Sequence, residues 1–228
     1  MTTPFYPMLD AWSYSRYADY KRCPFLFAHK HLLKMKDPNP GTALVRGREI
    51  HTLAEQALIL PVKGKWKCPP ELKHFEDEFR ALRTMNPTVE QQWGFRKDWT
   101  PTGWFGSDTY ARVVLDAVVV YDDNTAVVID HKTGKKYATN EDQMQLFALA
   151  TFKKFPDVTE VSTRLWYLDQ PVDNEVEMEY HKREEVSLQR DWEKAIVPMF
   201  KDRKFPPRAN DKCRWCFLSK AKGGPCKY

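Results

Sequence analysis

The feature that most constrains the fold is a pair of apolar segments, each interrupted by one aspartate. They read Arg112-Val-Val-Leu-Asp116-Ala-Val-Val-Val and Ala126-Val-Val-Ile-Asp130-His-Lys132-Thr-Gly134. Segments this rich in valine and isoleucine predict strands, and the Asp-Asp-Asn between them predicts a turn. The two segments are therefore expected to pair as an antiparallel hairpin. A carboxylate within an apolar strand is costly to bury unless a cation or a metal compensates it.

Helical and strand patterns alternate along the rest of the chain. Helices are predicted over 13–36 with a break at Pro24, and over 43–60, 71–84, 141–154 and 186–202. Strands are predicted over 89–96, 110–121, 125–131, 161–168 and 174–182. This order favours an α/β fold with a mixed central β-sheet flanked by helices. We expect one compact domain in three parts: a helical region 1–88, a core 89–205, and a cysteine-rich, metal-binding C-terminal tail 206–228.

Charge and hydropathy limit the classes of partner. Lys and Arg number 36 against 31 Asp and Glu, which gives a net charge of +5 and suits a polyanionic partner. No apolar run approaches the roughly 20 residues of a membrane span. No basic stretch followed by an apolar one is present at the N-terminus, so no secretory signal is predicted. We expect a cytoplasmic protein, prokaryotic or in the cytoplasm of an infected host, with no membrane partner.

Asp116, Asp130 and Lys132 are the first candidate site residues. Asp130 and Lys132 project from the same face of their strand because side chains alternate. Carboxylate oxygens bind Mg²⁺ or Mn²⁺, which lower the pKa of a bound water, and a lysine can orient that water. A solvated surface hairpin is the alternative, and the burial expected for Asp116 argues against it.

Two predicted helices carry possible supporting residues. Gly47 and His51 are four residues apart on one helix face, and imidazole is a good ligand for Mn²⁺-type metals. A lone helical histidine is more often simply packed or exposed. Gln143 and Phe147 share a face of the helix over 141–154, although Gln143 also fits a capping box with Asn140.

The motifs taken in order resemble a known family. They are G-x-x-x-H ending at His51, L-D-A-V around Asp116, I-D-x-K-T-G from Ile129, D-Q-x-x-x-F from Asp142, and the opening Ser13-Tyr-Ser-Arg-Tyr-x-x-Tyr-x-x-Cys23-Pro24. This series is similar to the RecB-like branch of the PD-(D/E)XK nuclease superfamily, whose core is restriction-endonuclease-like. The resemblance extends from about Ser13 to Cys226.

The resemblance implies a metal-dependent DNA nuclease and assigns its site. His51, Asp116, Asp130 and the His131 backbone carbonyl would bind Mg²⁺ or Mn²⁺, and Glu90 would reach the metal through water. Lys132 would activate the attacking water, and Gln143 would orient Lys132 or the DNA backbone. The sequence departs from the family at Phe147, where tyrosine is usual, and at Arg112-Val-Val-Leu, where a glycine often precedes the first aspartate.

DNA is the expected partner, as single strands or free ends, and the preferred activity is an exonuclease. The alternatives are a structure-selective endonuclease or CRISPR-type end-trimming factor, and a catalytically silent DNA-binding module. A further alternative is a structural metal protein without a nucleic-acid role. The residues predicted to contact DNA are Arg112, Lys135, Lys136, Phe147, Arg214 and Trp215.

The five cysteines favour thiols or metal ligation over disulfides. Cys213 and Cys216 have a spacing that lets both sulfurs reach one metal, and Cys226 follows in a glycine-rich segment. Cys23 is the best candidate for a fourth ligand, whereas Cys68 is predicted to be a bystander. Resemblance to AddB-type and CRISPR-associated iron–sulfur exonucleases implies a structural [4Fe–4S] cluster, with Zn²⁺ as the competing ion.

Overall fold

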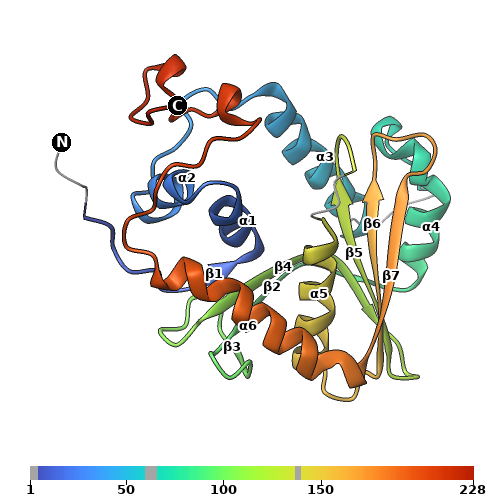
Figure 1. Cartoon of the computed structure of the whole chain (residues 1–228). Coiled ribbons are helices and arrows are strands. Elements are labelled where there is room, and N and C mark those ends of the chain that lie inside the picture. Colours follow the sequence, from blue (N-terminus) through green and yellow to red (C-terminus); the bar gives the residue numbers. More distant parts are fainter. Residues whose placement is uncertain (1–4, 60–65, 137–139) are drawn as a thin grey trace.

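A computed structural model describes residues 5–59, 66–136 and 140–228. Seven strands form one mixed sheet in the order β3-β2-β4-β5-β6-β7, with β1 paired to β4 (Figure 1). Their bounds are β1 Trp12–Ser13, β2 Thr88–Phe95, β3 Pro101–Thr102, β4 Ala111–Val120, β5 Thr125–Lys132, β6 Glu160–Tyr167 and β7 Glu175–His181. The β4–β5 hairpin is antiparallel and β5–β6 is parallel, as a mixed sheet requires.

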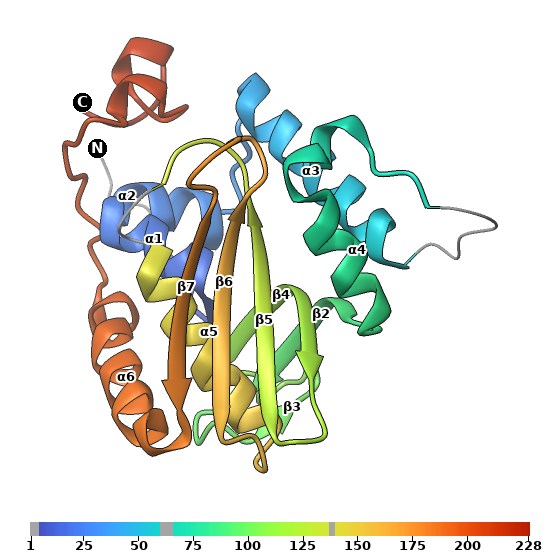
Figure 2. The same cartoon turned by 90° about the vertical axis from the view of Figure 1, so that its right-hand side faces the viewer.

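Helices cover both faces of the sheet (Figure 2). They are α1 Tyr14–Arg22, α2 Pro24–Phe27, α3 Thr42–Ile59, α4 Glu76–Thr84, α5 Asn140–Lys154 and α6 Glu185–Lys201. One core contains residues of α2, α5 and α6, and the second contains residues of α3 and α4. The predicted α/β fold with a mixed sheet flanked by helices is confirmed.

Most predicted elements match the observed ones within two residues, and the differences have local causes. The segment expected to be helical over 13–36 is divided into α1, α2 and a π-helical turn over Ala28–Leu32. Pro24 stands at the start of α2, where its missing N–H costs nothing. The strands β1 and β3, of two residues each, were not predicted because two residues carry no alternation pattern.

The side-chain alternation of β4 changes at Asp116. Val113 and Leu115 pack into the core on the α5 side. Ala117 and Val119, which have the same parity, pack into the opposite core beneath α3 and α4. Because strand side chains normally alternate between faces, residues of one parity should share a face. The pleat therefore slips by one residue at Asp116.

The neighbouring strand β2 changes at the matching position. Trp93 packs into the α5-side core, whereas Val89 packs into the α3-side core. Between them Glu90 has φ of 48°, in the left-handed region that side chains with a Cβ rarely adopt. The strand register places Glu90 opposite Asp116. The two acidic residues thus lie together where both strands change face.

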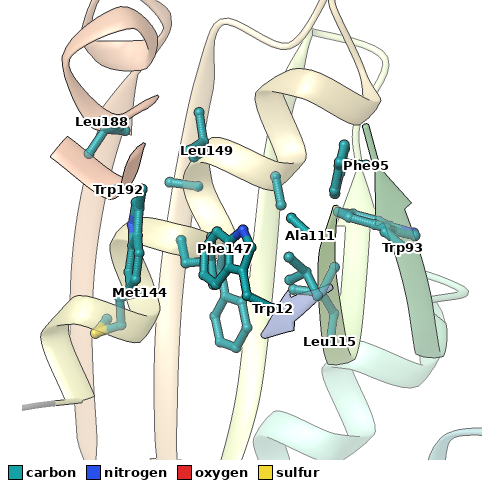
Figure 3. Close-up of a cluster of buried hydrophobic side chains, with 14 of the residues drawn as sticks. Trp12, Trp93, Phe95, Ala111, Leu115, Met144, Phe147, Leu149, Leu188 and Trp192 are labelled. Atoms are coloured by element: carbon teal, nitrogen blue, oxygen red, sulfur yellow. The ribbon is translucent and has the colours of Figure 1, made fainter. Parts of the chain in front are cut away.

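The α5-side core also fixes the position of one predicted DNA contact. Figure 3 shows Phe147 among Trp12, Met144, Leu149 and Trp192. Phe147 is 2% exposed. A ring with so little exposed surface has no open face for stacking on a base, although Phe147 lines a cavity beside Gln143, and its contact with DNA stays a prediction. The pattern placed Phe147 on the Gln143 face of α5, but the phenyl ring lies one turn further along, inside the core.

No helix in the described ranges has both the length and the apolar character of a membrane span.

Candidate metal centre

Three metal-type ligands converge where β2 and β4 change face. His51 comes from α3, Glu90 from β2 and Asp116 from β4. One ligand atom of each lies within 4.8 Å of the other two. Such a set of one imidazole nitrogen and two carboxylate oxygens suits Mn²⁺ and Mg²⁺. The residues of this centre therefore fit the divalent ion that the sequence predicts.

Asp116 is the most tightly held member of the centre. Its Oδ2 accepts a hydrogen bond from the backbone N–H of His131 at 2.6 Å and lies 3.3 Å from Nδ1 of His51. Burial opposes ionisation of Asp116, but the hydrogen bond from His51 and the nearby His131 outweigh it and lower its pKa. Asp116 is therefore held as a carboxylate, the form that binds a metal.

Asp116 raises the pKa of both other members of the centre. The hydrogen bond with Asp116 raises the pKa of His51. Burial, and then the charge of Asp116, raise the pKa of Glu90. Crowded acidic groups repel one another, and a divalent cation between them would relieve that repulsion.

Asp130 belongs to an adjoining network rather than to the three-ligand cluster. Its carboxylate lies 2.5 Å from Nζ of Lys132 and accepts a hydrogen bond from Nε2 of Gln143 at 3.1 Å. Nζ of Lys132 also donates to Oε1 of Gln143 at 2.8 Å. Burial raises the pKa of Asp130, and Asp116 raises it further, so the two carboxylates are close enough to interact. The predicted pairing of Asp130 with Lys132 on one face is present.

Gln143 has both of its amide atoms engaged in this network, so its side chain is not that of a capping box. The Gln143 side chain thus lies in the Asp130–Lys132 network, and its role in orienting Lys132 or the DNA backbone stays a prediction. Asn140, the other half of that pattern, donates from Nδ2 to the hydroxyl of Tyr167 at 2.7 Å instead.

Gly47 lies close to the loop after β5. A Cβ at this position would lie 3.2 Å from Oγ1 of Thr133. A larger residue would push α3 away from this loop, and His51 lies one helical turn further along α3. Gly47 therefore sets the distance between the histidine and the acidic strands.

Sequence and structure comparisons agree with this geometry. Residues 11–220 match the model of the PD-(D/E)XK nuclease superfamily. The chain belongs to this superfamily. No curated protein matches the sequence significantly. Among solved structures, a "Putative exonuclease" from Eubacterium rectale superimposes with a TM-score of 0.52 at 12% identity, covering 94% of this chain and 87% of that one. SSO0001 aligns with a TM-score of 0.43 at 16% identity over 97% of this chain and 89% of that one.

Membership makes the protein a metal-dependent nuclease by family, with a candidate acidic site at His51, Glu90 and Asp116. Glu90, predicted to reach the metal through water, offers a carboxylate oxygen within 4.8 Å of the ligand atoms of His51 and Asp116. Its left-handed backbone is the feature that sequence reasoning missed. The His131 imidazole is buried against Phe79, and burial lowers its pKa to about 4. The role of its backbone carbonyl stays a prediction.

The remaining residues predicted to contact DNA differ in the exposure and the hydrogen bonds of their side chains. Lys135 is exposed. Lys136 is engaged by Asp173 at 2.8 Å and by the carbonyl of Glu175. Arg112 is half-buried, and its Nε donates to the carbonyl of Trp104 at 2.9 Å.

The tail offers an aromatic surface. The Arg214 guanidinium lies 3.7 Å from the ring centre of Trp215, whose side chain is 53% exposed. A cation stacked on an exposed indole is a suitable platform for a nucleobase.

The four predicted cysteine ligands lie around one cavity between the tail and the N-terminal helices. Cys23, Cys213, Cys216 and Cys226 all line it. Cys23, at the start of α2, packs with Cys216 and Cys226. Cys68 lies elsewhere, and its thiol donates to the carbonyl of Pro69. The fold thus brings Cys23 next to the tail cysteines, although they are far apart in the sequence.

Proposed function

We propose that this protein is a Mg²⁺- or Mn²⁺-dependent DNA exonuclease that acts on single-stranded or end-exposed DNA. The convergence of His51, Glu90 and Asp116 beside the Asp130–Lys132–Gln143 network carries the proposal. The resemblance to RecB-like nucleases, and the name of the Eubacterium rectale structure, support the exonuclease.

His51, Glu90 and Asp116 would hold the ion, with Asp130 as the nearest further carboxylate. When bound, the ion would polarise the phosphate and lower the pKa of a water. Asp116 is positioned for this role by the His131 N–H, which fixes one of its oxygens.

Lys132 is the residue proposed to orient the attacking water. An ammonium has three N–H donors. Asp130 and Gln143 accept two of them, which fixes Nζ in place. The third can point to a water or to a phosphate oxygen. A lysine held by two acceptors loses little further freedom when substrate binds, and that favours catalysis by orientation.

A basic cavity supports a nucleic-acid substrate. The cavity that the cysteines line also carries seven Lys and Arg side chains and one carboxylate, Asp37. The basic residues are Arg22, Lys30, Lys34, Lys36, Arg48, Arg208 and Lys212. Arg48 precedes His51 by three residues on α3, so this charge lies next to the proposed metal centre. A groove of one sign attracts a polyanionic strand.

The nuclease is tested with purified protein on labelled single-stranded DNA in Mg²⁺ and in Mn²⁺. We expect degradation by the wild type, loss of degradation in chelator, and at least a 100-fold slower rate for Asp116→Asn and Lys132→Met, on the order expected for a removed transition-state donor. Asp157→Asn and Lys97→Met are matched controls at exposed positions. Normal cutting by the Asp116 or Lys132 variant would refute the assigned centre.

Circular single strands separate the exonuclease from its alternatives. An exonuclease degrades the linear strand and spares the circle, whereas a structure-selective endonuclease or end-trimming factor that recognises internal sites opens the circle. DNA binding without cleavage in either metal would instead indicate a catalytically silent module.

For the tail we propose a structural [4Fe–4S] cluster held by Cys23, Cys213, Cys216 and Cys226. Zinc bound by four thiolates needs sulfurs roughly 3.8 Å apart, from Zn–S bonds of about 2.3 Å in a tetrahedron. Within the described ranges, three ligand atoms approach to 4.8 Å at His51, Glu90 and Asp116 and at no cysteine trio. The resemblance to AddB-type and CRISPR-associated iron–sulfur exonucleases supports the cluster over a single ion.

Anaerobic purification with iron, sulfide and zinc analysis tests this assignment. We expect near four iron and four sulfide per chain and a broad visible absorption. Cys216→Ser should lose both, whereas Cys68→Ser should retain both as the matched control. One equivalent of zinc without iron would contradict the cluster.

A further inference from the structure

A second cavity adjoins the metal centre on the side of α1. Its lining includes Ser13, Ser15, Arg16, Trp104, Arg112 and Gln143. Gln143 is also the residue whose amide contacts Lys132 and Asp130. The cavity therefore shares a wall with the Asp130–Lys132–Gln143 network. Arg112 precedes Asp116 by four residues on β4, so their Cα atoms are no more than about 14 Å apart.

The short strand β1 creates this cavity. It pairs in parallel with the start of β4, and the register places Ser13 opposite Arg112. Ser13 is also the N-cap of α1, where its side chain accepts from the N–H of Arg16. Helix α1 has nine residues and no acidic side chain in its first turn. The partial positive charge at its N-terminus thus adds to the two arginines.

The two guanidinium groups donate hydrogen bonds to backbone carbonyls. Arg16 donates to the carbonyl of Ala11, and Arg112 donates to the carbonyl of Trp104. Within the described part of the chain, neither forms an ion pair with an acidic side chain at 4.0 Å or less. Each guanidinium has five N–H donors, so most remain for another acceptor.

Burial and mutual repulsion show that this arrangement is costly without an anion. Both arginines are half-buried. Burial, and then the charge of Arg112, lower the pKa of Arg16, while Asp10 offsets this only partly. Arginine cations are rarely buried without a counter-charge. An oxyanion seated between the two would remove the repulsion.

An aromatic surface borders the same arginine. The Arg112 guanidinium lies 5.6 Å from the ring centre of Trp104 and 5.9 Å from that of Phe105. Phe105 is 85% exposed. A base next to a bound phosphate could stack there, because every base offers a π-face.

We propose that this cavity binds one phosphate group of the DNA strand, adjacent to the phosphate that is cleaved, with Arg16 and Arg112 as its ligands. The inference rests on the proposed nuclease function. A terminal monoester and an internal diester present the same oxyanion, so the chemistry identified is a nucleic-acid phosphate. The pocket then fixes the strand relative to the metal centre.

Binding in chelator tests the pocket without any dependence on cleavage. Fluorescence anisotropy with a labelled single strand gives the Kd and its salt dependence. We expect Arg16→Gln and Arg112→Gln to weaken binding about 10-fold and to reduce the salt slope by about 0.7, the value for one lost phosphate contact on a single strand. Arg190→Gln, exposed on α6, is the matched control. Unchanged Kd and slope in both variants would overturn the proposal.

Ser15→Glu gives a second test that a folding defect cannot mimic. Ser15 is exposed in the first turn of α1, so a glutamate there should stabilise the helix while repelling a phosphate. We expect an unchanged or higher Tm together with weaker DNA binding, and Ser15→Gln should bind like the wild type. A Ser15→Glu variant that binds DNA normally would contradict the pocket.

Four substrates identify the source of the phosphate: strands with a 5′-phosphate, a 3′-phosphate or neither, and a circle. An arginine effect confined to one phosphorylated end assigns a terminal monoester, and an equal effect on all four assigns an internal diester. Wild-type protein that cuts DNA while the arginine variants bind normally would refute the pocket alone. Wild-type protein that never cuts DNA would refute the nuclease, and the binding data would stand.

Discussion

The left-handed backbone of Glu90 predicts which of two variants, Glu90→Gly or Glu90→Ala, has the larger free energy of unfolding. In an ordinary strand, glycine is less stable than alanine by about 0.5–1 kcal/mol because of its unfolded-state entropy. At Glu90, with φ of 48°, a Cβ costs about 1–2 kcal/mol that glycine does not incur. The two effects oppose each other, so Glu90→Gly should be more stable than Glu90→Ala by about 0.5–1 kcal/mol.

Chemical and thermal unfolding in chelator would measure this difference. In a protein of this length, about 1 kcal/mol corresponds to about 2–4 °C in Tm. Gln92 provides the matched control, because it lies two residues further along β2 in regular pairing with Val114. There Gln92→Ala should be more stable than Gln92→Gly. An alanine variant that is also more stable at Glu90 would refute the strained conformation.

The same pair of variants reports on the metal. Both remove the Glu90 carboxylate, so both should show a smaller rise in Tm on addition of Mn²⁺ than the wild type. Glycine and alanine should behave alike in this measurement although they differ in chelator. A full Mn²⁺ response in either variant would exclude Glu90 as a ligand.

Three further predictions concern Asp19 on α1 and the C-terminal tail. Burial opposes ionisation of Asp19, but hydrogen bonds from His31 and Lys30 outweigh it and lower its pKa. The stabilisation is therefore complete above the unfolded-state pKa and is lost as pH falls through the lower folded-state pKa. Asp19→Asn should cost about 1–3 kcal/mol at pH 7, and urea titrations should show this cost declining as pH falls below about 4. In Gly224→Ala the new Cβ would lie 2.3 Å from the Leu218 backbone, so limited proteolysis should cut the tail while Gly41→Ala, with open space, resists. Trp215→Ala should weaken single-strand binding in chelator by about 1–3 kcal/mol and Trp215→Phe by much less; equal affinities for the two would exclude stacking.

Local pattern was sufficient for most of the fold. The apolar runs around Asp116 and Asp130 predict a hairpin because strand formation there depends on near neighbours and a short turn. Pro24 predicts the helix break for a similarly local reason. By contrast β1 exists only because β4 extends beyond the end of β5 and offers an unpaired edge to Trp12 and Ser13. That depends on residues about a hundred positions away.

The candidate site was predicted in part, and the limit was geometric. The sequence, with its family resemblance, named His51, Asp116, Asp130, Lys132 and Gln143, and it named Glu90 as reaching the metal through water. The structure brings these residues to one end of the hairpin. Which carboxylate lies beside Asp116 could not be read from the pattern, because the strand alternation slips there. The burial of Phe147 was not predicted, because a helical period gives the face of a helix but not the depth at which each side chain lies.

The sequence by itself determined the strand and helix pattern, the acidic hairpin, the lysine two residues beyond Asp130, and the split cysteine set. These follow from composition and short-range periodicity, which act through neighbouring residues. Only the tertiary structure decided that Glu90 joins His51 and Asp116, and that Arg16 meets Arg112 across β1 and β4. Both contacts depend on backbone positions that long-range strand pairing fixes. An isolated strand would not keep Glu90 in the left-handed conformation, and an isolated helix end would not bring Arg16 and Arg112 together.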